Sequence, residues 1–152
     1  MPPEREERLD VQVFDEIRSI EHLVRATISR LLPVGLTYAQ WEVLKLLARR
    51  ADGASPGEIA EALHAPSGGL TGALQRLWAR KLVEVEHGPA EGGRKRVWLT
   101  PGGREVYAQA MAGLKPEIEM LREGFTEKEF RDALPFLRAL RAWLSEKDPL
   151  PA

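Results

Sequence analysis

The 152-residue sequence predicts a mainly α-helical protein that carries one small β-hairpin. Three observations support this fold class. Apolar residues recur every three or four positions through most of the chain, which is the period of amphipathic helices. Two short segments near the middle of the chain alternate apolar and polar residues, which is the period of strands. Capping signals of the type Ser/Thr-x-x-Glu/Gln mark where several of the helices begin.

The first two predicted helices are separated by a short loop. Apolar residues at helical spacing predict a helix over residues 10–32. After the loop, Thr37 and Gln40 have the spacing of a capping box, in which each side chain bonds the backbone N–H of the other residue. This box predicts a second helix over residues 37–50.

Two shorter helices joined by a tight turn follow. Ser55 and Glu58 form another capping box and open a third helix that ends near Leu63. Ser67 is expected to be the N-cap of a fourth helix that runs to about Lys81. The residues of this fourth helix expected to face the core are Leu70, Ala73, Leu74 and Leu77. Two short helices with a tight turn between them are the helix-turn-helix pattern.

The residues after the fourth helix predict a hairpin. Residues 83–86 and 96–99 alternate apolar and polar side chains, and the segment between them is rich in glycine and basic at its far end. We therefore expect two strands joined by a long, positively charged tip.

Two long helices are predicted to complete the chain. Thr100 caps the first, which runs to about Gly124 and is expected to kink at Pro116. Thr126 begins a third capping box and opens the last helix, in which Pro135 is expected to break the hydrogen-bond ladder.

Composition excludes several classes of protein. The chain has no cysteine, which rules out disulfides, thiolate nucleophiles and cysteine metal ligands. No apolar run approaches the roughly 20 residues that cross a bilayer, and the charged N-terminus lacks the apolar segment of a secretory signal. We expect a soluble cytoplasmic protein with no membrane association.

Charge is distributed unevenly along the chain. The formal net charge is −1, which by itself argues against a polyanion partner. However, residues 1–63 have a net charge of −3, residues 64–104 of +4 and residues 105–152 of −2. The positive charge therefore lies on the fourth helix and the hairpin, which points to nucleic acid as the partner of this segment.

The order of these elements resembles the MarR family of winged helix-turn-helix transcriptional regulators. The segments that carry the resemblance lie between Leu36 and Gly103: LTYAQWEVLKLLA, SPGEIAEAL, LTGALQRLWARKLVEVE and RVWLTPGGREV. The strongest local match is R-L-x-x-[RK]-x-L-V, from Arg76 to Val83, followed by L-T-x-x-G, from Leu99 to Gly103. The order and spacing of these segments make the match specific.

The resemblance implies how such a chain works. It implies a winged helix-turn-helix over residues 36–103 that places its fourth helix in the major groove of double-stranded DNA and its hairpin along the backbone. It implies a homodimer formed by residues 10–32 and 104–146, and small ligands that loosen DNA binding of a repressor. Apolar stripes on the terminal helices independently support the dimer, because they exceed what one small core can cover.

The candidate DNA contacts lie on the helix-turn-helix and the hairpin. They are Ser55, Ser67, Gly68, Thr71, Gly72, Gln75, Arg76, Arg94, Lys95 and Arg96. The exposed face of the fourth helix is unusual for the family, because glycines replace the Ser, Thr and Arg of its relatives. One interpretation is that glycine lets the backbone approach DNA closely, so that shape and phosphate contacts dominate. The other is that DNA binding has weakened or changed target.

The hairpin tip also departs from the family pattern. Glu91-Gly92-Gly93 stands in place of Asp-x-Arg, and the basic run from Arg94 to Arg96 arrives one residue late. Arg94 is a candidate for the minor groove, whose negative potential attracts guanidinium groups. Arg96 alternates with Val97 and is alternatively a residue of the exposed strand face. Glu91 is a candidate ion-pair partner of Arg76.

A small-molecule pocket is the second candidate site. By position in the family, the residues expected to line it are His22, Arg25, Ala26, Ser29, Tyr38 and Trp41. Aromatic rings beside one cation suit a planar aromatic or organic acid. Trp41 is alternatively a core residue, and Arg25 an ion-pair partner across the dimer.

Catalysis has little support in the sequence. Its three histidines lie in different elements, so a metal site is not expected, and no cofactor motif or nucleophile–base arrangement stands out. A DNA-binding transcriptional regulator, and not an enzyme, is the function expected. The alternatives are a winged-helix module that binds proteins after losing DNA binding, and the dimerisation domain of a larger enzyme.

Overall fold

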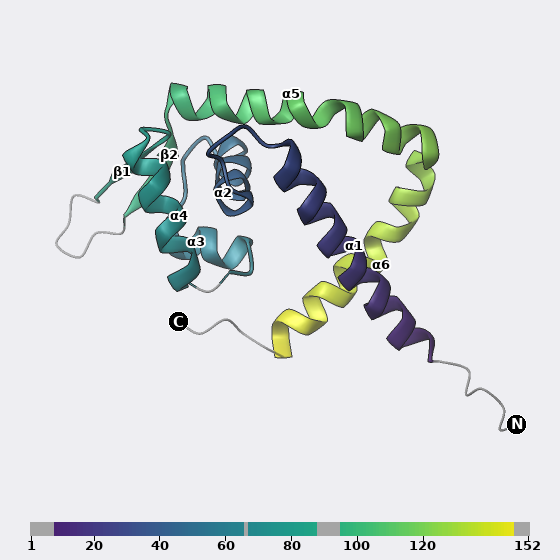
Figure 1. The fold of residues 1–152 in the computed structure, drawn as a ribbon. Helices are drawn as coiled ribbons and strands as arrows, with labels where there is room; N and C mark the ends of the chain where they lie inside the picture. The colour runs from purple at the N-terminus through teal and green to yellow at the C-terminus, as the bar shows by residue number, and fades with distance from the viewer. Residues whose placement is uncertain (1–7, 66, 88–94, 148–152) are drawn as a thin grey trace, which may run out of the picture.

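The computed structural model describes residues 8–65, 67–87 and 95–147. Within these residues it confirms the predicted order of elements and the mainly α fold class (Figure 1). In chain order the elements are α1 (Leu9–Leu31), α2 (Tyr38–Ala48), α3 (Pro56–Ala62), α4 (Ser67–Ala79), β1 (Val83–Glu86), β2 (Arg96–Leu99), α5 (Pro101–Gly124) and α6 (Glu127–Lys147).

Three helices begin at the capping boxes that the sequence predicts. In each box the hydroxyl oxygen of the first residue accepts from the backbone N–H three residues later, and the side chain of that later residue accepts from the first N–H. The pairs are Thr37–Gln40, Ser55–Glu58 and Thr126–Glu129. These bonds satisfy N–H groups that a helix start leaves without intrahelical partners, which explains why α2, α3 and α6 begin there.

One local expectation differs from the structure. Ser67 is the first residue of α4 and not the N-cap before it, a difference of one position at a helix end. Pro116 and Pro135 lie inside the helices α5 and α6, which continue past them. A proline removes one hydrogen bond, but its fixed φ is compatible with helix, so the turns on either side hold the backbone together.

The hydrophobic core lies in the part of the chain from α2 to the first half of α5. Its largest fully buried side chains come from three helices and the hairpin: Leu44, Leu47, Ile59, Leu77, Val43, Val83 and Val97. Strand β1 pairs antiparallel with β2, and Val83 and Val85 lie opposite Leu99 and Val97. The apolar side of the hairpin therefore packs on the helices, which gives the winged helix-turn-helix arrangement.

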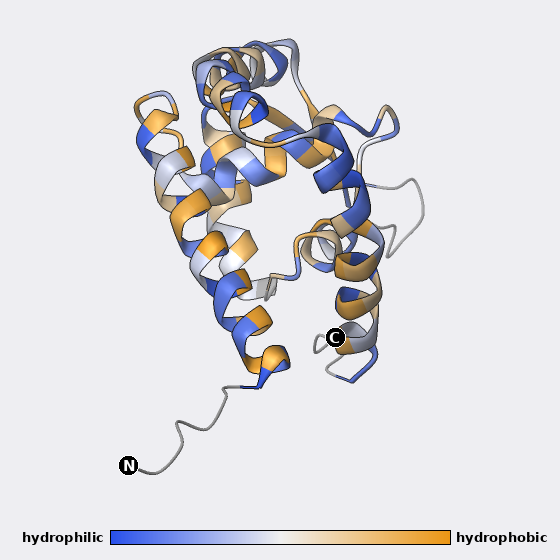
Figure 2. Cartoon of the chain, turned by 90° about the vertical axis from the view of Figure 1, so that its right-hand side faces the viewer, coloured by the Kyte–Doolittle hydropathy of each residue, from blue (hydrophilic) through white to orange (hydrophobic). Residues whose placement is uncertain are grey.

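The terminal helices extend away from this core. Figure 1 shows α5 running from the hairpin to the opposite end of the molecule, where α6 turns back. Neither α1 nor α6 contains a buried residue, although Figure 2 shows hydrophobic residues along α1, the helix that leads away from the N-terminus. Large apolar side chains of these helices therefore face solvent in the single chain.

Candidate nucleic-acid interface and ligand site

Helix α4 presents its core face and its exposed face as the sequence predicts. Leu70, Ala73 and Leu77 are buried, whereas Gly68, Gly72 and Gln75 are exposed on the opposite face. The exposed face is nearly free of side chains. It therefore offers backbone and one amide group to a partner.

The glycines of α4 are not required by packing within the chain. A Cβ added to Gly68, Gly69 or Gly72 would meet no described atom within 4 Å apart from its own neighbourhood in the helix. Glycine in a helix interior costs roughly 1 kcal/mol relative to alanine. Nothing in the described part of this chain offsets that cost, so any benefit of these glycines must come from a molecule outside it.

The two candidate serines are placed differently. Ser55 is only 9% exposed, and its hydroxyl oxygen already accepts from the Glu58 backbone N–H at 3.1 Å. The side chain of Ser67 lies outside the described part of the structure. Thr71 is exposed on α4 beside Gly72.

Two arginines line one flank of α4. Arg76 and Arg80 are one helical turn apart and border a groove of about 490 Å³, whose other lining residues are Gly35, Leu36, Thr37, Gln40 and Ala79. Arg80 is held in place, since its Nη1 donates to the Gly35 carbonyl at 3.0 Å. Two guanidinium groups near the N-terminus of α2 favour an anion such as a backbone phosphate. Arg80 was not among the predicted contacts, although its spacing of four from Arg76 is a usable signal.

The hairpin places its basic residues unequally. Lys95 is exposed just before β2. Arg96 is folded back, and its guanidinium donates to the carbonyl oxygens of Asp52 and Gly53. Arg94 and Glu91, including the suggested pairing of Glu91 with Arg76, lie outside the described residues.

The structure brings three of the predicted ligand-site residues together. The guanidinium carbon of Arg25 lies 4.7 Å from the centre of the Tyr38 ring, and the Tyr38 and Trp41 ring centres are 5.6 Å apart. Arg25 also donates to the Glu21 carboxylate at 2.7 and 2.9 Å. His22, Ala26 and Ser29 are exposed on the same helix.

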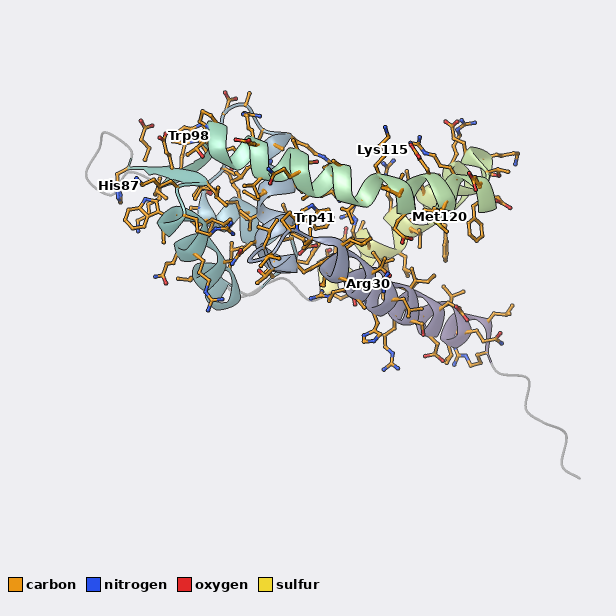
Figure 3. All side chains as sticks on the ribbon, turned by 45° about the horizontal axis from the view of Figure 1, so that its top comes forward. Arg30, Trp41, His87, Trp98, Lys115 and Met120 are labelled. Carbon is orange, nitrogen blue, oxygen red and sulfur yellow. The ribbon has the colours of Figure 1, made fainter. Side chains whose placement is uncertain are left out.

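Trp41 is a core residue by burial, at 4% exposure. Among the described residues its indole Nε1 is buried and has no hydrogen-bond partner, a state that costs roughly 1–3 kcal/mol. Lys45 lies over the same ring, with Nζ 5.0 Å from its centre. Figure 3 shows Trp41 away from the hairpin end, where Trp98 and His87 lie. Thr37 and Gln40, which adjoin Tyr38 and Trp41 in the sequence, line the groove beside Arg76 and Arg80.

Electrostatics at this second site favour a neutral phenol and a charged guanidinium. Burial, reinforced by the charge of Glu42, raises the pKa of Tyr38 above its ordinary value, and Arg25 opposes this shift. The hydrogen bond from Arg25 to Glu21 raises the pKa of the guanidinium further. Arg25 is therefore a permanent cation beside an uncharged aromatic ring.

Metal chemistry has no site in the part of the chain that the structure describes. No three metal-ligating side chains gather there, and His22, His64 and His87 are all exposed. Among residues 8–65, 67–87 and 95–147, no helix is long and apolar enough to cross a membrane.

Known proteins share both the sequence pattern and the fold. A model of the MarR family matches residues 34–95. The transcriptional regulator HosA of Escherichia coli O111:H- is 31% identical over 100 residues, which are 66% of this chain and 73% of that protein. Bordetella bronchiseptica BpsR, whose structure concerns the regulation of its DNA binding by 6-hydroxynicotinic acid, aligns with a TM-score of 0.72 and 26% identity over 86% of this chain and 98% of its own. Staphylococcus aureus MarR, solved with salicylate and kanamycin, aligns with a TM-score of 0.77 and 17% identity over 92% of this chain and 95% of its own.

Proposed function

This chain belongs to the MarR family of transcriptional regulators, and from that premise we propose that it is a homodimeric DNA-binding repressor modulated by a small organic acid. In this proposal residues 36–103 bind double-stranded DNA, and residues 10–32 and 104–146 form the dimer. The protein works in the cytoplasm and has no catalytic step.

The exposed face of α4 is the observation that carries the DNA-binding proposal. No neighbouring atom of the chain would block a side chain at its glycines. The lack of side chains there therefore suits a backbone that lies close to a DNA groove. Arg76 and Arg80 on its flank, and Lys95 at the hairpin, supply cations for phosphates on either side. Such an interface positions the protein mainly through the DNA backbone and DNA shape, with Gln75 and Thr71 as the base-edge contacts.

The repressor proposal is tested by footprinting on the promoters of the gene itself and of the neighbouring gene. Protection of a two-fold symmetric site that overlaps a promoter element is the expected result, because a symmetric dimer binds two half-sites about one helical turn apart. Protection only upstream of the promoter elements would indicate activation. Uniform protection without a discrete site would indicate that base readout has been lost.

The dimer proposal rests on the apolar surfaces of the terminal helices. Helices in proteins are stabilised mostly by packing of an apolar face, and the 21-residue helix α6 has no buried residue in the single chain. Phe136 and Trp143 are 57% and 55% exposed in the single chain. Pairing with a second copy would bury them, and the expected particle mass is twice the 17.0 kDa of one chain.

The ligand proposal rests on Arg25, Tyr38 and Trp41. A planar acid would stack on the aromatic rings and pair its carboxylate with Arg25, and a carboxylate oxygen would also satisfy the unpaired Trp41 N–H. The regulation of BpsR by 6-hydroxynicotinic acid supports this class of ligand. Calorimetric titration with 6-hydroxynicotinate and salicylate tests it, with benzamide, which lacks the carboxylate, as the control.

The alternative function is a winged-helix module that binds another protein in place of DNA. The scarcity of hydrogen-bonding side chains on the exposed face of α4 favours it. The two functions differ in their response to salt, since binding to DNA phosphates weakens steeply with ionic strength.

A further inference from the structure

The guanidinium group of Arg96 closes a contact between the hairpin and the turn that joins α2 to α3. Its Nε and Nη2 donate to the Asp52 carbonyl at 3.1 and 2.8 Å, and Nη2 also donates to the Gly53 carbonyl at 3.1 Å. A planar fork of donors reaches two successive carbonyl groups in this way, which the single ammonium group of lysine does not reproduce.

The backbone joins the same two segments. Ala54 N donates to Val97 O at 3.0 Å, and Val97 N donates to Ala54 O at 2.8 Å. Gly53 has a φ of +69°, and a Cβ there would lie 2.5 Å from Val97 O and 2.8 Å from Trp98 Nε1. Strand β2 therefore rests directly on a turn that only glycine can form without strain.

Glu58 adds a charged group at this junction. Its carboxylate lies 4.0 Å from Arg96 Nη1 and 3.6 Å from Arg50 Nη1, and it accepts from the Ser55 N–H in the capping box of α3. These side chains are about 40% exposed, so the ion pairs themselves contribute little. Together with the carbonyl groups, Glu58 surrounds the Arg96 guanidinium with partners from the turn and from α3.

We propose that Arg96 is a positioning residue, which fastens the base of the hairpin to the helix-turn-helix and acts on DNA only through the hairpin that it holds. We call Arg96 with Asp52 and Gly53 the hairpin latch. The sequence placed Arg96 among the DNA contacts, but its Nε and Nη2 atoms are engaged by the latch and its Nη1 faces Glu58. Lys95, the adjacent residue, is exposed and takes the contact with phosphate.

The latch adds side-chain hydrogen bonds to a hairpin whose two strands are already attached at their bases, and it limits the tilt that remains. Strand β1 reaches the rest of the protein through α4, and β2 reaches it through the turn at Asp52–Ala54 and through α5. With the latch closed, the orientation of the hairpin relative to α4 is already fixed in the free protein, before DNA binds. The free energy of DNA binding is then not reduced by the entropy cost of ordering the hairpin. This inference rests on the DNA-binding function proposed above.

Substitutions at two adjacent residues test the latch. Arg96→Lys keeps the charge and loses the fork, Arg96→Gln loses both, and Lys95→Gln is the matched control. Two quantities are measured: the affinity for the footprinted promoter DNA at two salt concentrations, and the hydrogen-exchange rates of the Ala54 and Val97 amides in the free protein. Amides of Leu44 and Leu114 in the core report global stability.

Arg96→Lys and Arg96→Gln are expected to weaken DNA binding alike, by roughly tenfold, the loss expected for hydrogen bonds from a charged group. Exchange at Ala54 and Val97 is expected to accelerate by roughly the same factor, and exchange at the core amides by no more than that, because the lost bonds also lower the stability of the folded state. Lys95→Gln should lower affinity and reduce the salt slope by about one, with exchange unchanged.

Two results would overturn the proposal. One is an Arg96→Lys protein that binds DNA as tightly as the wild type while Arg96→Gln does not, since that identifies a charge contact with phosphate. The other is unchanged exchange at Ala54 and Val97 in both variants. If the wild-type protein binds no DNA, the function proposed above fails, and the exchange rates alone decide whether the latch exists.

Discussion

Arg25 on α1 stacks on the ring of Tyr38 on α2, with its guanidinium carbon 4.7 Å from the ring centre. This contact connects a terminal helix, which has no buried residue, to the helix-turn-helix. A ligand carboxylate that binds Arg25 would compete with both Glu21 and the Tyr38 ring. In the function proposed above, the contact would couple a bound acid to the angle between the terminal helices and the helix-turn-helix.

Replacing Arg25 is expected to uncouple the ligand from DNA binding. Arg25→Gln should lower the affinity for 6-hydroxynicotinate or salicylate by roughly tenfold or more, because it removes a charge-assisted hydrogen bond. DNA affinity without ligand should change little, since Arg25 lies outside the DNA interface. Arg18→Gln, an exposed arginine on the same helix, is the control. Equal ligand affinity of the two variants would exclude Arg25 from the site.

Tyr38 is expected to ionise above the ordinary tyrosine value of about 10, because burial and the charge of Glu42 raise its pKa. The chain has two tyrosines, so the absorbance of phenolate in Tyr107→Phe reports Tyr38 alone. A raised pKa in the folded state means that the corresponding stability is complete below about pH 10 and is lost as pH rises through the folded pKa. A midpoint at or below 10 in the folded protein contradicts the placement of Tyr38.

The dimer should depend on the apolar side chains of α6. Phe136→Glu combined with Trp143→Glu places two charges where the proposed interface is apolar, and we expect particles of 17.0 kDa in light scattering in place of twice that mass. Trp78→Glu is the control, because Trp78 is 61% exposed but lies on α4. If the double variant remains a dimer, the interface is elsewhere.

Gly72 separates the two interpretations of the glycine-rich helix. Gly72→Ala is expected to raise the free energy of unfolding by roughly 0.5–1 kcal/mol, since alanine favours helix and no described atom blocks the new Cβ. If the backbone lies close to DNA, the same change should weaken DNA binding despite the gain in stability. Gly69→Ala, on the flank of α4, is the comparison. A more stable Gly72→Ala protein with unchanged DNA affinity means that the glycines serve no close approach.

Features that depend on residues close together in the sequence were predictable, whereas contacts between residues far apart in the sequence were not. The starts of α2, α3 and α6 were predicted because a capping box is complete within four residues. The core face of α4 followed from the spacing of Leu70, Ala73 and Leu77. In contrast, Arg96 bonds a carbonyl 44 residues earlier in the chain, and Arg80 bonds one 45 residues earlier. Neither partner is a side chain, so the sequence carries no pattern that pairs them. The approach of Trp98 to Gly53 depends likewise on the strand meeting the turn in three dimensions.

The same distinction applies to the ligand site. Arg25, Tyr38 and Trp41 were proposed from their positions in two helices, and the structure brings them together. The buried Nε1 of Trp41 depends on how α2 packs on its neighbours, which residue spacing alone does not specify.

Salt-dependent binding to promoter DNA tests the central claim most directly. The measurement is the affinity of the wild-type protein for its footprinted site and for a scrambled duplex of equal length, between 50 and 200 mM salt. Arg76, Arg80 and Lys95 from two protomers supply the cations, so we predict a slope of log affinity against log salt of about −4 or steeper, with tighter binding to the promoter site. Absence of binding to both duplexes at the lowest salt, or an affinity independent of salt, would contradict the assignment of this chain as a DNA-binding regulator.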